Sequence, residues 1–262
     1  MAFDAKTGVH YVLHGPAYGV PLLVGLPLMA SHVEIFGKDS AAVLQGYLGR
    51  LTDRYRVLLL DYPSIGGSRD IPPEELTAER VCADLLGVAS AAGFDRFAYW
   101  GYSWGGAVGL QLAARTTRLT ALVIGGWPAL GGTYAQAIVA ARAKQPNPDA
   151  GARVVLRSPA QYAQWIHFYA SVLDWPEAKS VAGIACPRLL FFGEDGDIVE
   201  AGIPIPIAST IRAHRRELQA LGWQVVEVPG HGHGLTLHPE LVVPPIRAFL
   251  DSHLSADAKI PT

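Results

Sequence analysis

The chain has 262 residues, a length that fits one large domain or two small ones and is enough for a full hydrophobic core. Half of the residues are hydrophobic and only 17% are charged, which excludes a disordered chain. The formal net charge is −2 and like charges do not form long runs, which argues against nucleic acid and anionic membranes as partners.

The sequence shows no pattern typical of a metal site, a signal peptide or a membrane anchor. Cys82 and Cys186 lie far apart and lack metal-ligand spacing, so we expect two buried, unreactive thiols and no metal site. The amino terminus has no apolar block of a signal peptide or anchor, and the longest apolar runs are far below the ~20 residues of a spanning helix. We therefore expect a soluble, cytoplasmic protein that does not bind membranes.

Short aliphatic runs alternate with longer segments of helical periodicity, which is typical of a parallel sheet covered by helices on both faces. The central runs lack polar alternation, as expected for strands buried on both sides. In chain order we expect strands at 9–14 and 21–24, a helix at 34–51, a strand at 56–60, a helix at 73–92, a strand at 96–101, a helix at 105–114, strands at 121–125 and 188–192, a helix at 207–221, a strand at 224–228 and a helix at 241–254.

Residues 127–185 break this alternation because they contain no credible strand. Turn sequences at Gly131-Gly132 and at 146–149 are followed by a cluster of aromatic residues between 162 and 175. A structureless loop of this length is unusual in a compact domain, so we predict a helical lid at 127–185. It would be inserted into an α/β core formed by 1–126 and 186–262, within one structural domain. Ordinary core packing is the alternative role for the aromatic residues.

A candidate nucleophile follows the expected strand at 96–101. The sequence Gly101-Tyr102-Ser103-Trp104-Gly105 has the GxSxG pattern of a nucleophile elbow, in the strand, turn and helix context that gives the pattern its meaning. Glycine at 101 and 105 removes steric clashes at so tight a turn, which holds the serine hydroxyl above the carboxyl edge of the sheet. An ordinary glycine-rich turn is the alternative.

A serine hydroxyl needs an adjacent base, and histidine can serve because its usual pKa is near 6.5. Three of the nine histidines, at 231, 233 and 238, follow the last expected strand. A loop at that strand's carboxyl end shares a sheet edge with Ser103, so contact is geometrically allowed. We predict His233 as the base, with His231 as the alternative.

The base in turn needs an acceptor, usually a carboxylate, to hold it in one tautomer. Three acidic residues, Glu194, Asp195 and Asp197, follow the expected strand at 188–192 and precede the histidine in the chain. We predict Asp197 as the acid of the triad, with Asp195 as a close alternative. The remaining carboxylates would then solvate the turn.

The tetrahedral oxyanion of acyl transfer needs two backbone donors. We expect the N–H of Trp104, at the start of the following helix, and the N–H of Leu26, since Pro27 has none. Apolar side chains expected to line a substrate crevice under the lid are Leu26, Leu28, Trp127, Trp165, Phe168 and Trp175.

These motifs, together with Asp-Tyr-Pro-Ser-Ile-Gly-Gly-Ser at 61–68, resemble the α/β-hydrolase superfamily over nearly the whole chain. The resemblance implies an eight-stranded, mostly parallel sheet with helices on both faces, a helical cap after the sixth strand, and no cofactor. It also implies activity on esters, lactones, amides, thioesters or carbon–carbon bonds. Val24 stands where the family often has histidine, and the family's usual acid position is Gly196. Serine at the elbow argues against epoxide hydrolases and haloalkane dehalogenases, which carry aspartate at that position.

We therefore expect a serine hydrolase that cleaves a carboxylic ester or lactone of a small-to-medium apolar substrate through an acyl-enzyme. Carbon–carbon bond hydrolase or lyase chemistry on the same residues is one alternative. A non-catalytic, ligand-binding homologue is another. The sequence leaves the oligomeric state open, a homodimer included.

Overall fold

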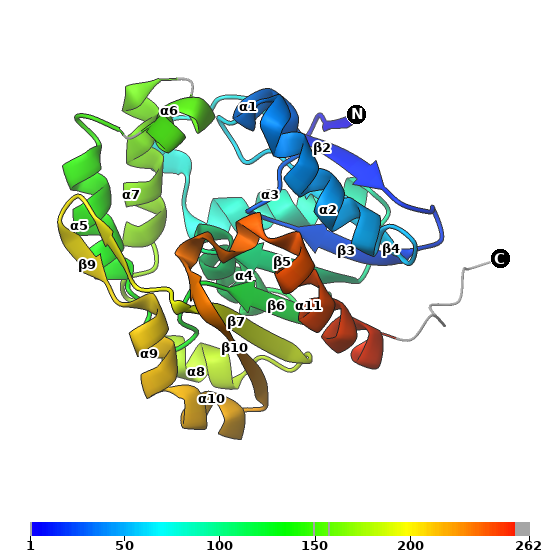
Figure 1. The fold of residues 1–262 in the computed structure, drawn as a ribbon. Helices are drawn as coiled ribbons and strands as arrows, with labels where there is room; N and C mark the ends of the chain where they lie inside the picture. The colour runs from blue at the N-terminus through cyan, green and yellow to red at the C-terminus, as the bar shows by residue number, and fades with distance from the viewer. Residues whose placement is uncertain (1, 149, 157, 255–262) are drawn as a thin grey trace.

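The computed structural model describes residues 2–148, 150–156 and 158–254, which form an eight-stranded sheet flanked by helices (Figure 1). The strand order is β1-β2-β4-β3-β5-β6-β7-β10. The pairs β1–β2 and β2–β4 are antiparallel and the other pairs of this sheet are parallel, so the predicted α/β-hydrolase fold class is confirmed. The strands are β1 (Ala2–Asp4), β2 (Val9–His14), β3 (Val20–Val24), β4 (Tyr55–Leu60), β5 (Phe97–Tyr102), β6 (Leu119–Gly125), β7 (Arg188–Asp195) and β10 (Trp223–Gly232).

Two of the seven predicted strands run further than the sequence indicated. Strands β7 and β10 continue to Asp195 and Gly232, which pair with each other at the end of the sheet. The residue pattern predicted turns at these positions. It did not predict β1 or a separate antiparallel hairpin formed by β8 (Ile198–Glu200) and β9 (Ile203–Ile205).

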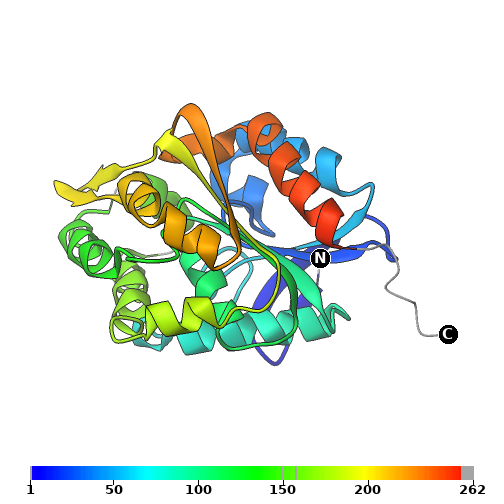
Figure 2. The ribbon, with the colours of Figure 1, turned by 90° about the horizontal axis from the view of Figure 1, so that it is seen from below.

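The central strand β5 is buried on both faces, which explains its continuous apolar sequence. Phe97 and Tyr99 belong to one hydrophobic core and Ala98 and Trp100 to the other. Each fully buried large apolar side chain contributes about 1.5–3 kcal/mol. Figure 2 shows α11 and α3 on opposite sides of the sheet, each covering one of these cores.

The helices of the α/β core follow the predicted order, with three breaks. The helix expected at 73–92 is interrupted at Leu76 and Thr77. The helix expected at 34–51 is interrupted at Gly37, whose φ of 83° ends the first segment. The helix expected at 207–221 is divided at His214. The observed helices are α1 (His32–Phe36), α2 (Ala41–Leu51), α3 (Ala78–Ala91), α4 (Trp104–Ala113), α9 (Ile207–Ala213), α10 (Arg215–Ala220) and α11 (Pro239–His253), with 3₁₀ turns η1 (Lys38–Ser40), η2 (Pro73–Glu75) and η4 (His233–Leu237).

Between β6 and β7 the described residues form helices and one isolated bridge, Leu156 with Ile65. The elements are α5 (Tyr134–Lys144), α6 (Ala150–Val155), η3 (Pro159–Tyr162), α7 (Ala163–Ala170) and α8 (Glu177–Ala182). Helices α5, α6 and α7 stand together at one side of the sheet (Figure 1). The predicted turn at 146–149 is described as far as Pro148, and Asp149 lies outside the described residues. Within the described parts of the chain, every helix is too short or too polar to cross a membrane.

Candidate active site

Ser103 lies in the turn between β5 and α4, with φ 53° and ψ −122°. Positive φ is costly for a residue with a side chain, and such strain is concentrated at functional sites. The surrounding packing holds this conformation, since the Ser103 N–H donates to the Gly125 carbonyl oxygen at 2.8 Å. A Cβ atom at position 101 would lie 2.2 Å from the carbonyl oxygen of Gly105, so only glycine fits there.

His233 is brought to this serine from the other end of the chain, directly after β10. Its Nε2 lies 2.9 Å from Ser103 Oγ, and the Tyr102 hydroxyl donates to the His233 carbonyl oxygen at 2.9 Å. The imidazole of His231 is engaged elsewhere, with Nδ1 2.8 Å from the Pro229 carbonyl oxygen. Of the two predicted candidates, the structure therefore places His233 beside Ser103.

Neither predicted acid is hydrogen-bonded to this histidine. Asp195 and Asp197 are exposed, while Gly196 between them is buried, in a turn closed by a hydrogen bond of 3.0 Å from the Gly196 N–H to the Gly193 carbonyl oxygen. Asp197 instead accepts from the N–H of Ser209 at 3.0 Å and from the Ser209 hydroxyl, in the first turn of α9. The structure thus brings together two of the three predicted triad residues.

Nδ1, on the far side of the His233 ring, is buried and lacks a hydrogen-bond partner among the described residues. Burial lowers the pKa of His233 to about 4. The ring is therefore neutral at pH 7, and a proton on Nδ1 leaves Nε2 free to accept from Ser103.

The loop after β3 is tied to the elbow and to β4. The Tyr102 N–H donates to the Leu26 carbonyl oxygen at 2.8 Å. The fully buried carboxylate of Asp61 accepts from the Ser31 N–H at 2.9 Å, the Ser31 hydroxyl at 2.6 Å and the Gly67 N–H at 2.8 Å. These bonds give the predicted 61–68 motif a structural role, because they fix the loop that carries Leu26.

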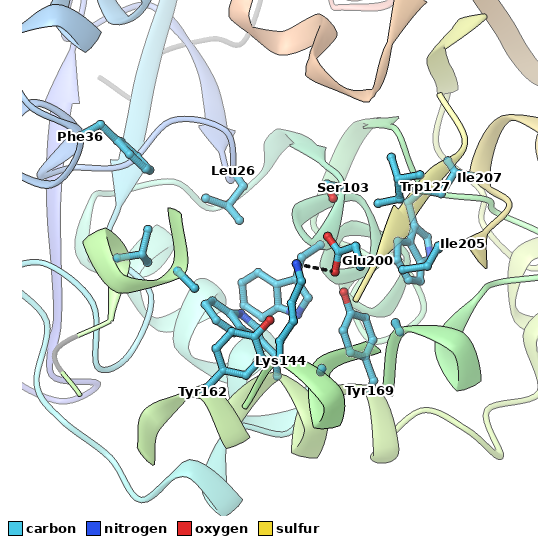
Figure 3. Close-up of a pocket in the computed structure, with 17 residues that line it drawn as sticks. Leu26, Phe36, Ser103, Trp127, Lys144, Tyr162, Tyr169, Glu200, Ile205 and Ile207 are labelled. Carbon is cyan, nitrogen blue, oxygen red and sulfur yellow. Dashed lines mark ion pairs between the residues drawn. The ribbon is translucent and has the colours of Figure 1, made fainter. Parts of the chain in front are cut away.

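Ser103 opens onto a first hollow of about 340 Å³, which also includes the predicted oxyanion residues Leu26 and Trp104. The helical insertion and the β8–β9 hairpin supply most of its walls. Figure 3 shows the Lys144–Glu200 ion pair across it, with Nζ 3.1 Å from Oε2. Other side chains that line this hollow are Trp127, Trp165, Tyr162, Tyr169, Ile198 and Ile205.

A second hollow of about 540 Å³ meets the first at Ser103 and lies against α1 and α2. His233 lines this hollow and is not among the residues that line the first. The two hollows thus share Leu26, Phe36 and Ser103 and differ in the other residues that line them. Further lining residues are Pro27, His32, Phe36, Val43, Tyr102 and Leu237.

Three predicted substrate contacts need correction. Trp127 and Trp165 line the first hollow, as expected. Leu28 and Phe168 have no exposed surface, and Trp175 packs against the core and does not line either hollow. Leu28 is packed in the core beneath α2 and α11, and the Phe168 ring lies 5.0 Å from that of Trp104. An apolar side chain near a site is as readily used for core packing as for substrate contact.

The sequence analysis missed the β8–β9 hairpin and its contribution to the first hollow. Ala201 and Gly202 have φ of 50° and 79°, the conformation of a two-residue hairpin turn. The signal was the Ile-Val and Ile-Pro-Ile runs on either side of Ala-Gly. Lys144 and Glu200 were not predicted, because nothing in their spacing brings α5 to β8.

Neither cysteine lies at this site. Cys82 is buried and Cys186 is partly buried, and burial raises the pKa of both thiols, that of Cys82 to about 12. In the described part of the chain, no group of three or more histidine, cysteine or acidic side chains is placed to hold a metal ion.

A model of the "Alpha/beta hydrolase family" matches residues 12–244, so the chain belongs to this family. Among curated proteins it is 35% identical over 109 residues to "Putative carbamate hydrolase RutD" of Enterobacter cloacae subsp. cloacae, covering 41% of this chain and 40% of that protein. It is 26% identical over 188 residues to the protein of the same description from Azorhizobium caulinodans, covering 69% of this chain and 65% of that one. The chain thus covers less than two thirds of the length of these relatives.

The fold is also similar to solved structures. A thermophilic esterase from Thermogutta terrifontis superposes with a TM-score of 0.67 at 20% identity, covering 94% of both chains. The enol-lactonase from Burkholderia xenovorans LB400 gives 0.66 at 21% identity, covering 92% of this chain and 96% of that one. At such identities the likeness shows the fold alone.

Proposed function

We propose that this hydrolase cleaves a carboxylic ester or lactone of a small-to-medium apolar substrate through an acyl-enzyme on Ser103. The observation that carries the proposal is the 2.9 Å approach of His233 Nε2 to Ser103 Oγ, at a strained turn that opens onto a hollow. A base in hydrogen-bond contact with a serine hydroxyl is the arrangement that activates it as a nucleophile.

In the proposed reaction, Ser103 Oγ attacks the carbonyl carbon while its proton moves to His233 Nε2. The N–H groups of Leu26 and Trp104 would hold the oxyanion, each contributing about 3–4 kcal/mol. The bond to the leaving oxygen then breaks and leaves an acyl group on Ser103. Water releases the acid in a second cycle of the same steps.

The two hollows suggest how a substrate is oriented. The proton acceptor must also be the group that faces the leaving group, and His233 lines only the second hollow. The leaving group would therefore occupy the second hollow and the acyl group the first, beneath the helical insertion acting as a lid. The Lys144–Glu200 pair would lie on the acyl side.

Covalent labelling tests the nucleophile. A fluorophosphonate probe should label the wild-type protein at Ser103 and should not label Ser103→Ala. Ser252→Ala is the matched control, because Ser252 is exposed on α11 and labelling should persist. A panel of p-nitrophenyl esters, lactones and carbamates then defines the substrate, carbamates being included because of the description of the sequence relatives. Labelling of Ser103→Ala, or of neither protein, contradicts the proposal.

A non-catalytic ligand-binding role is the second candidate, favoured by the unpartnered Nδ1 of His233. A histidine without its carboxylate is a poorer catalyst, since the loss of that group lowers kcat by about 10⁴ in serine proteases. Absence of both labelling and turnover, with retained binding of an ester or lactone, would favour this role.

A further inference from the structure

The buried side of His233 lacks the carboxylate that a triad would provide. The buried positions at the ends of two nearby strands are glycines and carry no carboxylate. They are Gly125 at the end of β6, Gly126 directly after it, and Gly196 directly after β7. A Cβ atom at 196 would lie 2.8 Å from the carbonyl oxygen of Gly193, so the backbone leaves little room for a side chain there. These glycine positions therefore cannot supply the carboxylate that His233 lacks.

This arrangement affects the charged intermediate. When Ser103 transfers its proton, the imidazole becomes a cation whose Nδ1–H has no acceptor. Burial lowers the pKa of this ring to about 4, which also disfavours the cation. The cation is therefore costly to form, and when its proton returns to Ser103 Oγ the bond from Oγ to the carbonyl carbon breaks and the substrate is restored. A leaving group that can depart only with a proton from this cation is then at a disadvantage.

We propose that the site acts on acyl compounds whose leaving group departs as a stabilised anion, such as an enolate, a phenolate or a thiolate, and that alkyl esters are poor substrates. The inference rests on the proposed function of Ser103 as nucleophile. It also agrees with the second hollow, where the rings of His32, Phe36 and Tyr102 offer a surface to a flat leaving group.

The two half-reactions differ in their need for the proton. In acylation, the bond from Ser103 Oγ to the carbonyl carbon forms and the proton moves to Nε2. The bond to the leaving atom breaks with its electron pair, so a stabilised anion leaves without that proton. In deacylation, water attacks and gives a proton to Nε2, and the Ser103 oxygen leaves as an alkoxide that must take a proton back. Deacylation is therefore slow for every substrate, and the acyl-enzyme accumulates.

Rapid-mixing kinetics with one acyl group test this. We would compare p-nitrophenyl, phenyl, isopropenyl and ethyl acetate with the full-length wild-type protein. The activated acetates should release a burst of one leaving group per Ser103 and then share one kcat, set by deacylation. The ratio of kcat/KM between p-nitrophenyl and ethyl acetate should exceed the ratio of their hydroxide-catalysed rates by roughly 10²-fold or more, the contribution of general acid catalysis.

The opposite results overturn the inference. These are the absence of a burst, or ethyl acetate used as well as p-nitrophenyl acetate after correction for hydroxide reactivity. Acylation by Asp195→Asn and by Asp197→Asn should stay within about threefold of wild type. A loss of about 10³–10⁴ in either variant would return that carboxylate to the triad. Failure of the proposed function looks different, because fluorophosphonate labelling of Ser103 would then be missing altogether.

Discussion

Lowering the pH tests whether His233 is electrostatically isolated. Burial lowers its pKa from 6.5 to about 4. At about 1.4 kcal/mol per pH unit, this difference of roughly 2.5 corresponds to about 3 kcal/mol. The folded protein binds this proton less tightly than the unfolded chain does. The free energy of unfolding is therefore unaffected above pH 6.5 and falls by about 3 kcal/mol as the pH drops from 6.5 to 4.

Two assays follow the same proton. The rate of fluorophosphonate labelling at Ser103 should stay high well below pH 6.5 and reach half of its maximum near pH 4 to 5, because Nε2 remains unprotonated. Urea unfolding of wild type and His233→Gln, measured from pH 7 to 4, isolates the contribution of this ring to stability. Burial also lowers the pKa of His32, but that residue is present in both proteins and cancels.

A labelling midpoint near 6.5 or above would refute this reasoning. It would mean that an acceptor stabilises the imidazolium in solution, as in a complete triad. Equal loss of stability in wild type and His233→Gln would refute the burial argument separately. The two results are distinguishable. The labelling midpoint reports how stable the His233 cation is in the active site, and the unfolding curves report how much that cation lowers the free energy of unfolding.

Three further predictions concern packing and charge elsewhere. Gly101→Ala places a Cβ 2.2 Å from the Gly105 oxygen and should lower the free energy of unfolding in urea by about 3 kcal/mol. The control is Gly49→Ala, at an exposed position with open space around it, which should raise the free energy of unfolding by up to about 1 kcal/mol. Equal effects of the two substitutions would contradict the packing argument. Burial raises the pKa of Asp84 to about 6, so its contribution to stability is present below pH 4 and is lost as the pH rises through 6. Asp84→Asn should remove about 3 kcal/mol of that pH dependence, and an unchanged slope would argue against it. Trp165→Ala should increase kcat/KM for longer acyl chains by roughly tenfold per methylene accommodated. Trp175 does not line the hollow, so Trp175→Ala should leave the chain-length preference unchanged. The reverse result would contradict the assignment of the hollow to the acyl group.

The order of strands and helices could be predicted because each element carries its own periodic signal. Strand β5 is a continuous apolar run whose side chains pack in both cores, and the glycines at 101 and 105 identify the turn that follows it. What the pattern did not resolve were interruptions by single residues. Gly37 at φ 83° divides one expected helix, although apolar spacing continues across it. Periodicity reports which face is buried, and a break of one residue hardly changes it.

The pairing of Ser103 with His233 was predictable for a topological reason. Parallel strands end at one edge, so residues that follow β5 and β10 reach the same side of the sheet. The acid cannot be found by that rule alone. Asp195, the last residue of β7, and Asp197 lie at this edge, but both are exposed, while Gly196 between them is buried in a turn closed by its N–H on the Gly193 carbonyl oxygen. Sequence position fixes the edge that a residue reaches, whereas the conformation of the turn after the strand decides whether a carboxylate faces the imidazole or water. The residue pattern does not define the turn at 193–196, so it cannot separate a triad from a serine–histidine pair.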